Sequence, residues 1–164
     1  MVLRAPDETT MIWAGTAQAI MITIGYLAAC VAAGLFSAAA ATKLGGVYYA
    51  DPLAEFGHFT FLASAASVTA MLAGFWPSAA VVALTEGLKL RGIATYLVAG
   101  CVIGLIVALP ISEFLRGADV PELQSPMIQL SVASGAIGGF VYWLIAGRTA
   151  GRWLSYRLFE ENRR

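Results

Sequence analysis

The sequence has few charged side chains. Asp, Glu, Lys and Arg together make up 12% of its 164 residues, which is about half of the roughly 25% found in ordinary soluble domains. Ten basic residues balance ten acidic ones, so there is no excess of positive charge of the kind that contacts nucleic-acid phosphates. These shortages argue against a soluble enzyme, a nucleic-acid-binding protein and a disordered chain.

Side chains suited to metal binding or catalysis are also scarce. Cys30 and Cys101 both lie in apolar stretches, and His58 is the sole histidine. A metal site needs several ligands at short spacing, so we expect no metal and no cofactor, and we interpret both cysteines as small apolar residues. His58 is the one candidate cofactor ligand, for a haem or a chlorophyll, although a lone histidine beside a loop is more simply a polar residue at a helix end. Phosphate-binding glycine loops, Ser–His–Asp sets and HExxH motifs do not occur, and we expect no enzymatic activity.

Long uncharged stretches dominate the rest of the chain. They cover residues 9–42, 56–85, 92–112 and 123–147, and each exceeds the roughly 20 residues that carry a helix across the hydrocarbon core. The sequence therefore predicts an all-α, polytopic membrane protein with four transmembrane helices in a single domain over residues 1–164. We place the helices at about 14–41, 57–84, 92–112 and 127–147, followed by a basic cytoplasmic tail at 148–164.

Two stretches leave alternatives open. The first resembles a secretory signal peptide, with small residues at Ala38 to Ala40, but it is about twice the ~7–15 apolar residues of such a peptide and lacks a basic start. We therefore expect a retained helix. The second contains Pro77. Its helix either starts near Ser64 and runs through a proline kink to Leu84, or spans Gly57–Trp76 with a short helical extension beyond.

The basic residues indicate how the helices are oriented. With four crossings, the two termini and the middle loop share one side, and that side carries Arg4, Lys89, Arg91, Arg148, Arg152, Arg157, Arg163 and Arg164. The other side carries only Lys43 and Arg116. Because basic loops stay in the cytoplasm, we expect both termini to be cytoplasmic. We interpret Glu86 and Arg91 as a solvated pair in the middle loop.

Small residues recur at every fourth position in each predicted helix, which puts them on one helix face. In the third and fourth helices these predicted packing residues are Gly100, Gly104, Ala108, Ser131, Gly135 and Gly139. Similar rows occur in the first two helices, and two of the four rows contain GxxxG. Since lipid tails are as apolar as leucine, close backbone packing is what joins such helices. The rows serve either packing within one bundle or docking onto another subunit.

The arginines of the C-terminal tail predict contact with lipid. Arg148, Arg152 and Arg157 accompany aromatic residues in this segment, and each basic residue near an anionic membrane surface contributes ~1 kcal/mol of attraction. The alternative is docking onto an acidic cytoplasmic partner.

Two segments resemble a known group of proteins. The stretch GGFVYWLIAGR at 138–148, followed by AGR at 150–152, resembles the last helix of small uncharacterised four-helix membrane proteins of alphaproteobacteria, and TEGLKLR at 85–91 is similar to their middle loop. The resemblance covers about half the chain. It implies a location in a bacterial inner membrane and supplies no mechanism.

The functional expectation follows from what the helices lack. None of the four predicted crossings has an acidic or basic residue at mid-depth, and such residues usually mark ion or substrate pathways. We therefore expect a non-catalytic accessory or scaffolding subunit that packs against other membrane subunits or forms a homo-oligomer. The alternatives are a small transporter or channel module that works as an oligomer, and a subunit that holds a cofactor through His58.

Overall fold

The computed structural model describes residues 8–44, 51–88, 90–109 and 126–149, and these residues form four α-helices and one short 3₁₀ turn. The elements are α1 (Glu8–Leu44), α2 (Pro52–Gly87), α3 (Ile93–Ala108), α5 (Pro126–Ile145) and η1 (Gly147–Thr149). The described part of the protein is therefore all-α, as the sequence predicts.

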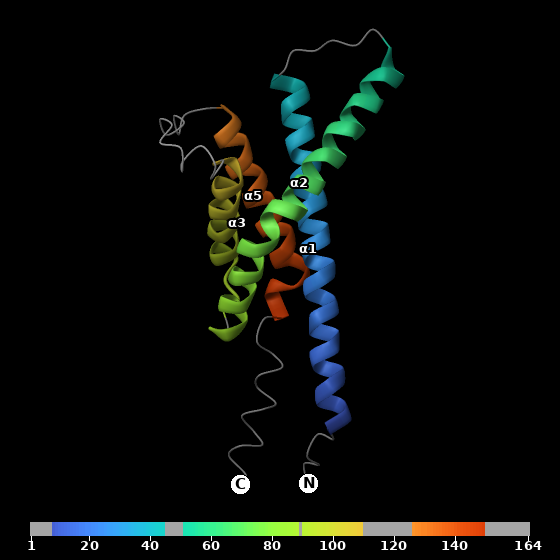
Figure 1. Ribbon diagram of the computed structural model, residues 1–164. Coiled ribbons are helices and arrows are strands. Elements are labelled where there is room, and N and C mark those ends of the chain that lie inside the picture. The colour runs from blue at the N-terminus through green and yellow to red at the C-terminus, as the bar shows by residue number, and fades with distance from the viewer. Residues whose placement is uncertain (1–7, 45–50, 89, 110–125, 150–164) are drawn as a thin grey trace.

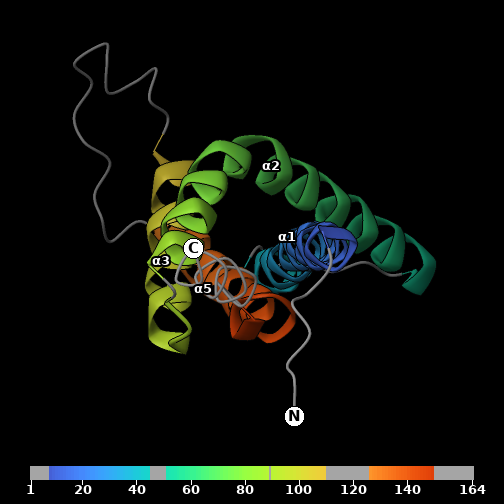
Figure 2. The ribbon, with the colours of Figure 1, turned by 90° about the horizontal axis from the view of Figure 1, so that it is seen from below.

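The four helices alternate in direction, so that the start of α1 and the end of α5 lie at the same end of the molecule (Figure 1). Helix α1 packs along both α2 and α5, and α3 packs along α5. Helix α2 touches α3 much less. Viewed along the molecule, α2 curves from the outer side of α1 round to α3 (Figure 2).

Local sequence explains where several helices begin and end. Asp51 caps α2, since its carboxylate accepts a hydrogen bond from the Leu53 backbone N–H at 3.0 Å. Pro52 takes the first helical position, where its missing N–H costs nothing. Helix α3 ends at Ala108 because Leu109 adopts an extended backbone, with φ −88° and ψ 106°, as a residue that precedes a proline prefers.

The bounds differ from the sequence-based ones in both directions. Helices α1 and α2 extend beyond the predicted 14–41 and 57–84, because uncharged residues alone do not mark where a helix stops. Helix α3 ends at Ala108 rather than continuing to 112, and residues 110–112 lie outside the described part of the chain. Helix α2 continues through Pro77 as a single element and starts at Pro52, before both of the predicted beginnings, Gly57 and Ser64. Helix α5 ends at Ile145, two residues before the predicted end.

Large apolar side chains cover much of the outside of the molecule. Trp13 and Trp76 are 73% and 78% exposed, and the helices are apolar on all sides rather than on one face, as helices in lipid are. Three helices are long and apolar enough to cross a membrane, namely α1 over Gly15–Lys43, α2 and α5, whereas α3 is a shorter apolar helix of 16 residues. These features are those of a membrane protein.

Candidate functional site

A close backbone contact joins α3 to α5 through glycines that face each other. A methyl group added to Gly100 would overlap the carbonyl oxygen of Gly135, and one added to Gly135 would overlap that of Gly100. The same relation holds between Gly104 and the carbonyl oxygen of Ser131. The two backbones therefore lie in direct contact, which requires residues without side chains at these positions.

Gly139 completes this contact, since a methyl group there would overlap the carbonyl oxygen of Tyr96. Ala108 lies half-buried as the last residue of α3. The structure thus brings Gly100, Gly104, Ser131, Gly135 and Gly139 into one contact inside the chain.

Helix α1 packs on α5 with its own row of small residues. A methyl group on Gly138 would lie 3.3 Å from the carbonyl oxygen of Ala29. Further along the same pair of helices, the hydroxyls of Ser37 and Ser134 hydrogen-bond each other at 2.7 Å. The small-residue rows of α1, α3 and α5 therefore face one another within the chain, and a partner subunit would have to bind elsewhere.

A cavity of about 300 Å³ lies where α2 faces the other three helices. Ala66 and Ala70 of α2 line it opposite Ala99 and Gly104 of α3, and α1 and α5 complete its wall. The cavity arises because small side chains on α2 face small side chains on α3. These side chains cannot fill the space that the curved path of α2 leaves. The cavity is the main feature that the sequence analysis missed.

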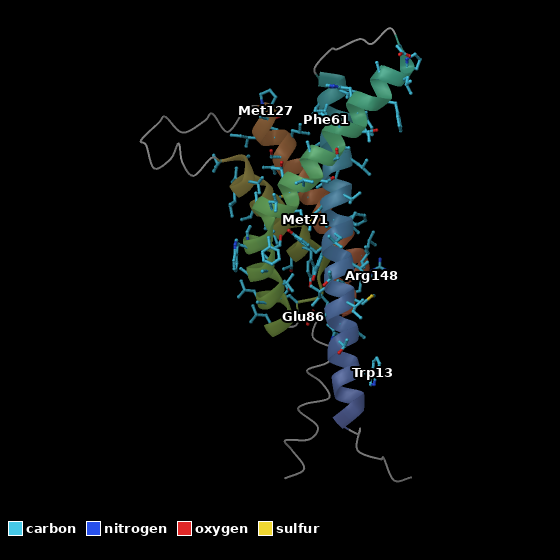
Figure 3. All side chains as sticks on the ribbon, turned by 45° about the vertical axis from the view of Figure 1, so that its right-hand side comes forward. Trp13, Phe61, Met71, Glu86, Met127 and Arg148 are labelled. Atoms are coloured by element: carbon cyan, nitrogen blue, oxygen red, sulfur yellow. The ribbon has the colours of Figure 1, made fainter. Side chains whose placement is uncertain are left out.

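Polar and aromatic side chains gather at one end of the cavity. The rings of Tyr96 and Tyr142 lie 5.7 Å apart between centroids and line this end. Next to them, the amide nitrogen of Gln18 donates to Glu86 Oε1 at 2.8 Å, and Thr85 is buried. Glu86 is half-buried in the last turn of α2 and faces α1 (Figure 3). The interpretation of Glu86 as a loop residue was therefore wrong, and the sequence carried no signal for a partner 68 residues away.

The same end of the molecule carries a cluster of aromatic and basic residues. The indole nitrogen of Trp143 donates to the backbone carbonyl of Arg91 at 3.0 Å, and the guanidinium of Arg148 stacks over the Trp143 ring at 4.5 Å. A tryptophan held in this way suits the boundary between lipid and water. The other two predicted lipid-contacting residues, Arg152 and Arg157, lie outside the described residues.

His58 lies in the second turn of α2, far along that helix from the cavity end at Glu86, and is half-buried. Within residues 8–44, 51–88, 90–109 and 126–149, no group of three or more His, Cys, Asp or Glu residues is placed to hold a metal ion. Cys30 is buried in the cavity wall, and Cys101 is half-buried; neither forms a disulfide.

Comparisons of the chain with protein-family models, curated protein sequences and solved structures give no match. The functional argument therefore depends on the geometry described above.

Proposed function

We propose that the protein is a four-span membrane protein of the bacterial inner membrane with both helix-bundle termini in the cytoplasm. Three helices have the length and composition for crossing. Helix α3 supports a fourth crossing because it packs along α5, which has the required length and composition. Helix α3 therefore lies at the same depth in the membrane as α5. Arg91 precedes α3 and Arg148 follows α5, and both contact Trp143. They therefore lie at the end of the molecule where α1 starts and α5 ends, and the distribution of basic residues along the chain favours the cytoplasm for that end.

Within the membrane, the proposed role is that of a non-catalytic accessory or scaffolding subunit. The observation that carries this role is the first part of α2, which stands apart from the other helices (Figure 1). Leu53, Phe56 and Phe61 are 76%, 67% and 68% exposed there. Helix α2 is ~54 Å long at 1.5 Å per residue, against a hydrocarbon core of ~30 Å. The other described helices leave these first turns uncovered, and the proposal is that a neighbouring subunit covers them.

A photoreactive amino acid at Phe56 tests this role in the native membrane. We expect irradiation to join the protein to a membrane polypeptide in a complex of one defined mass, and the mass distinguishes a second copy of this chain from a different subunit. A photoreactive residue at Val102, which is exposed on α3, serves as the control and should give lipid adducts. Lipid adducts alone from both positions would overturn the accessory role.

The second candidate, a transporter or channel module, is favoured by the cavity between the helices. The lining is mostly small and apolar, which suits an apolar molecule rather than an ion, because an ion needs polar ligands or water. Flux of a solute into liposomes that contain the pure protein would favour the transporter over the accessory subunit.

A further inference from the structure

The wall of the cavity presents little hydrogen-bonding capacity to its interior. The Tyr26 hydroxyl donates to the backbone carbonyl of Met71 at 2.6 Å, and the Thr69 hydroxyl donates to that of Ala65 at 2.9 Å. Ser134 both meets Ser37 at 2.7 Å and donates to the backbone carbonyl of Leu130. A buried water needs two to four polar partners. Because these polar groups bond within the protein, the cavity suits hydrocarbon better than water.

The cavity is long and follows the helices. Its lining runs along α3 from Tyr96 to Val107 and along α2 from Ala66 to Val82. Eleven helical steps on α3 correspond to ~17 Å at 1.5 Å per residue. A space of this shape matches an extended hydrocarbon chain lying parallel to the helices, as the chains of membrane lipids do.

The two ends of the cavity differ in polarity. At one end, the hydroxyl-bearing rings of Tyr96 and Tyr142 lie beside the hydrogen-bonded pair of Gln18 and Glu86. Both rings are buried, and the Tyr96 hydroxyl donates to the backbone carbonyl of Leu90 at 3.1 Å, so this end of the cavity carries aromatic rings with polar groups. The opposite end, near Val107, has the hydroxyl of Ser131 but no aromatic ring or charged side chain among the described lining residues.

Helices α2 and α3 are loosely packed against each other along the cavity. These two helices touch far less than α3 and α5 do. One of their contact points is the approach of Gly74 to Ile103, where an added methyl group would still be 3.8 Å from the isoleucine side chain. Lateral entry of a chain from lipid therefore requires no break in the tightly packed α3–α5 pair.

We propose that this cavity binds a single hydrocarbon chain of a membrane amphiphile, acyl or prenyl, with its polar end at Tyr96 and Tyr142. This proposal depends on the membrane location but not on the accessory role. An elongated apolar space, internally bonded polar groups, a polar aromatic end and the loose packing of α2 against α3 are the four observations that carry it.

Photoreactive lipids in liposomes test the proposal. One arm uses a phosphatidylcholine with a diazirine near the methyl end of one acyl chain, and a second arm uses a diazirine-bearing prenyl alcohol. Adducts on the purified, reconstituted protein are mapped by residue. We expect adducts at Ile103 and Val107, which line the cavity away from its tyrosine end, in addition to adducts at the outward-facing Val98 and Val102. The arm that labels the cavity residues identifies the type of chain.

A variant that fills the cavity is compared with a control variant on the outer side of the same helix. In Ala70→Phe the new ring occupies the cavity, whereas in Ala80→Phe it lies on the exposed side of the same helix. We expect the ratio of Ile103 to Val102 adducts to fall several-fold in Ala70→Phe and to stay unchanged in Ala80→Phe. Adducts at Val102 show in every sample that the protein has inserted into the liposome membrane. A protein that does not insert is therefore distinguished from an inserted protein whose cavity holds no lipid chain.

Two results would overturn the proposal. One is a wild-type protein labelled only at Val98 and Val102 by both lipids. The other is an unchanged ratio in Ala70→Phe. If Ala70→Phe does not insert, Ala66→Leu, which also reduces the cavity from α2, replaces it with the same expected fall.

Discussion

Replacing Gly100 with alanine tests the close contact between α3 and α5. The added methyl group would meet the carbonyl oxygen and carbon of Gly135 and the Cα of Gly139. All three are backbone atoms, so no side-chain rotation relieves the overlap and the helices must separate. Overpacking of this kind costs ~1–3 kcal/mol, more than the ~0.5–1 kcal/mol that alanine gains over glycine in a helix.

Gly74→Ala is the matched control for this variant. It changes another buried helical glycine, but the added methyl group lies 3.8 Å from Ile103 and 3.9 Å from Ser78, which is ordinary contact. Gly74→Ala should therefore match or exceed the wild-type stability, and the difference between the two variants isolates the overlap.

The free energy of unfolding is measured by titrating sodium dodecyl sulfate into detergent micelles and following tryptophan fluorescence. The double variant Gly100→Ala/Gly135→Ala should lose less than the sum of the single losses, because the first methyl group has already separated the helices. Gly100→Ala with the stability of Gly74→Ala would refute the backbone contact.

Two further substitutions test single hydrogen bonds by the same unfolding measurement. Gln18→Leu removes the donor to Glu86 and should lower the free energy of unfolding by ~1–3 kcal/mol, since it leaves a half-buried carboxylate without this bond. In a Glu86→Leu background this loss should disappear. An equal loss in both backgrounds would contradict the pairing of Gln18 with Glu86. Ser37→Ala should cost only ~0.5–1.5 kcal/mol, because Ser134 keeps its bond to the Leu130 carbonyl; a loss of several kcal/mol would show that this bond does not compensate.

The sequence predicts the helices better than it predicts how they meet. Charge-free runs locate all four helices of the described residues, because lipid-compatible segments must exclude charge over a fixed length. They leave the ends open, as α2 shows by starting at Pro52 and not 57. The capping carboxylate of Asp51 was the signal for that start.

Contacts between distant residues were beyond the reach of sequence patterns. A row of small residues marks a face that allows close approach, but it does not identify the neighbour, so the meeting of Gly100 with Gly135 required the structure. The row of small residues on α2 likewise does not identify a neighbour, since Ala66 and Ala70 line a cavity and do not pack directly on another helix. The Gln18–Glu86 bond likewise depends on how far α2 continues beyond Pro77.

Cysteine accessibility tests the four-span arrangement most directly. In a background with Cys30→Ala and Cys101→Ala, single cysteines replace Asp51, Arg91 and Asp119, and intact cells are treated with a membrane-impermeant maleimide. The account predicts labelling at positions 51 and 119 in intact cells and labelling at position 91 only after the membrane is permeabilised. Labelling of 91 and 119 from the same side would contradict it, because α3 would then not cross the membrane.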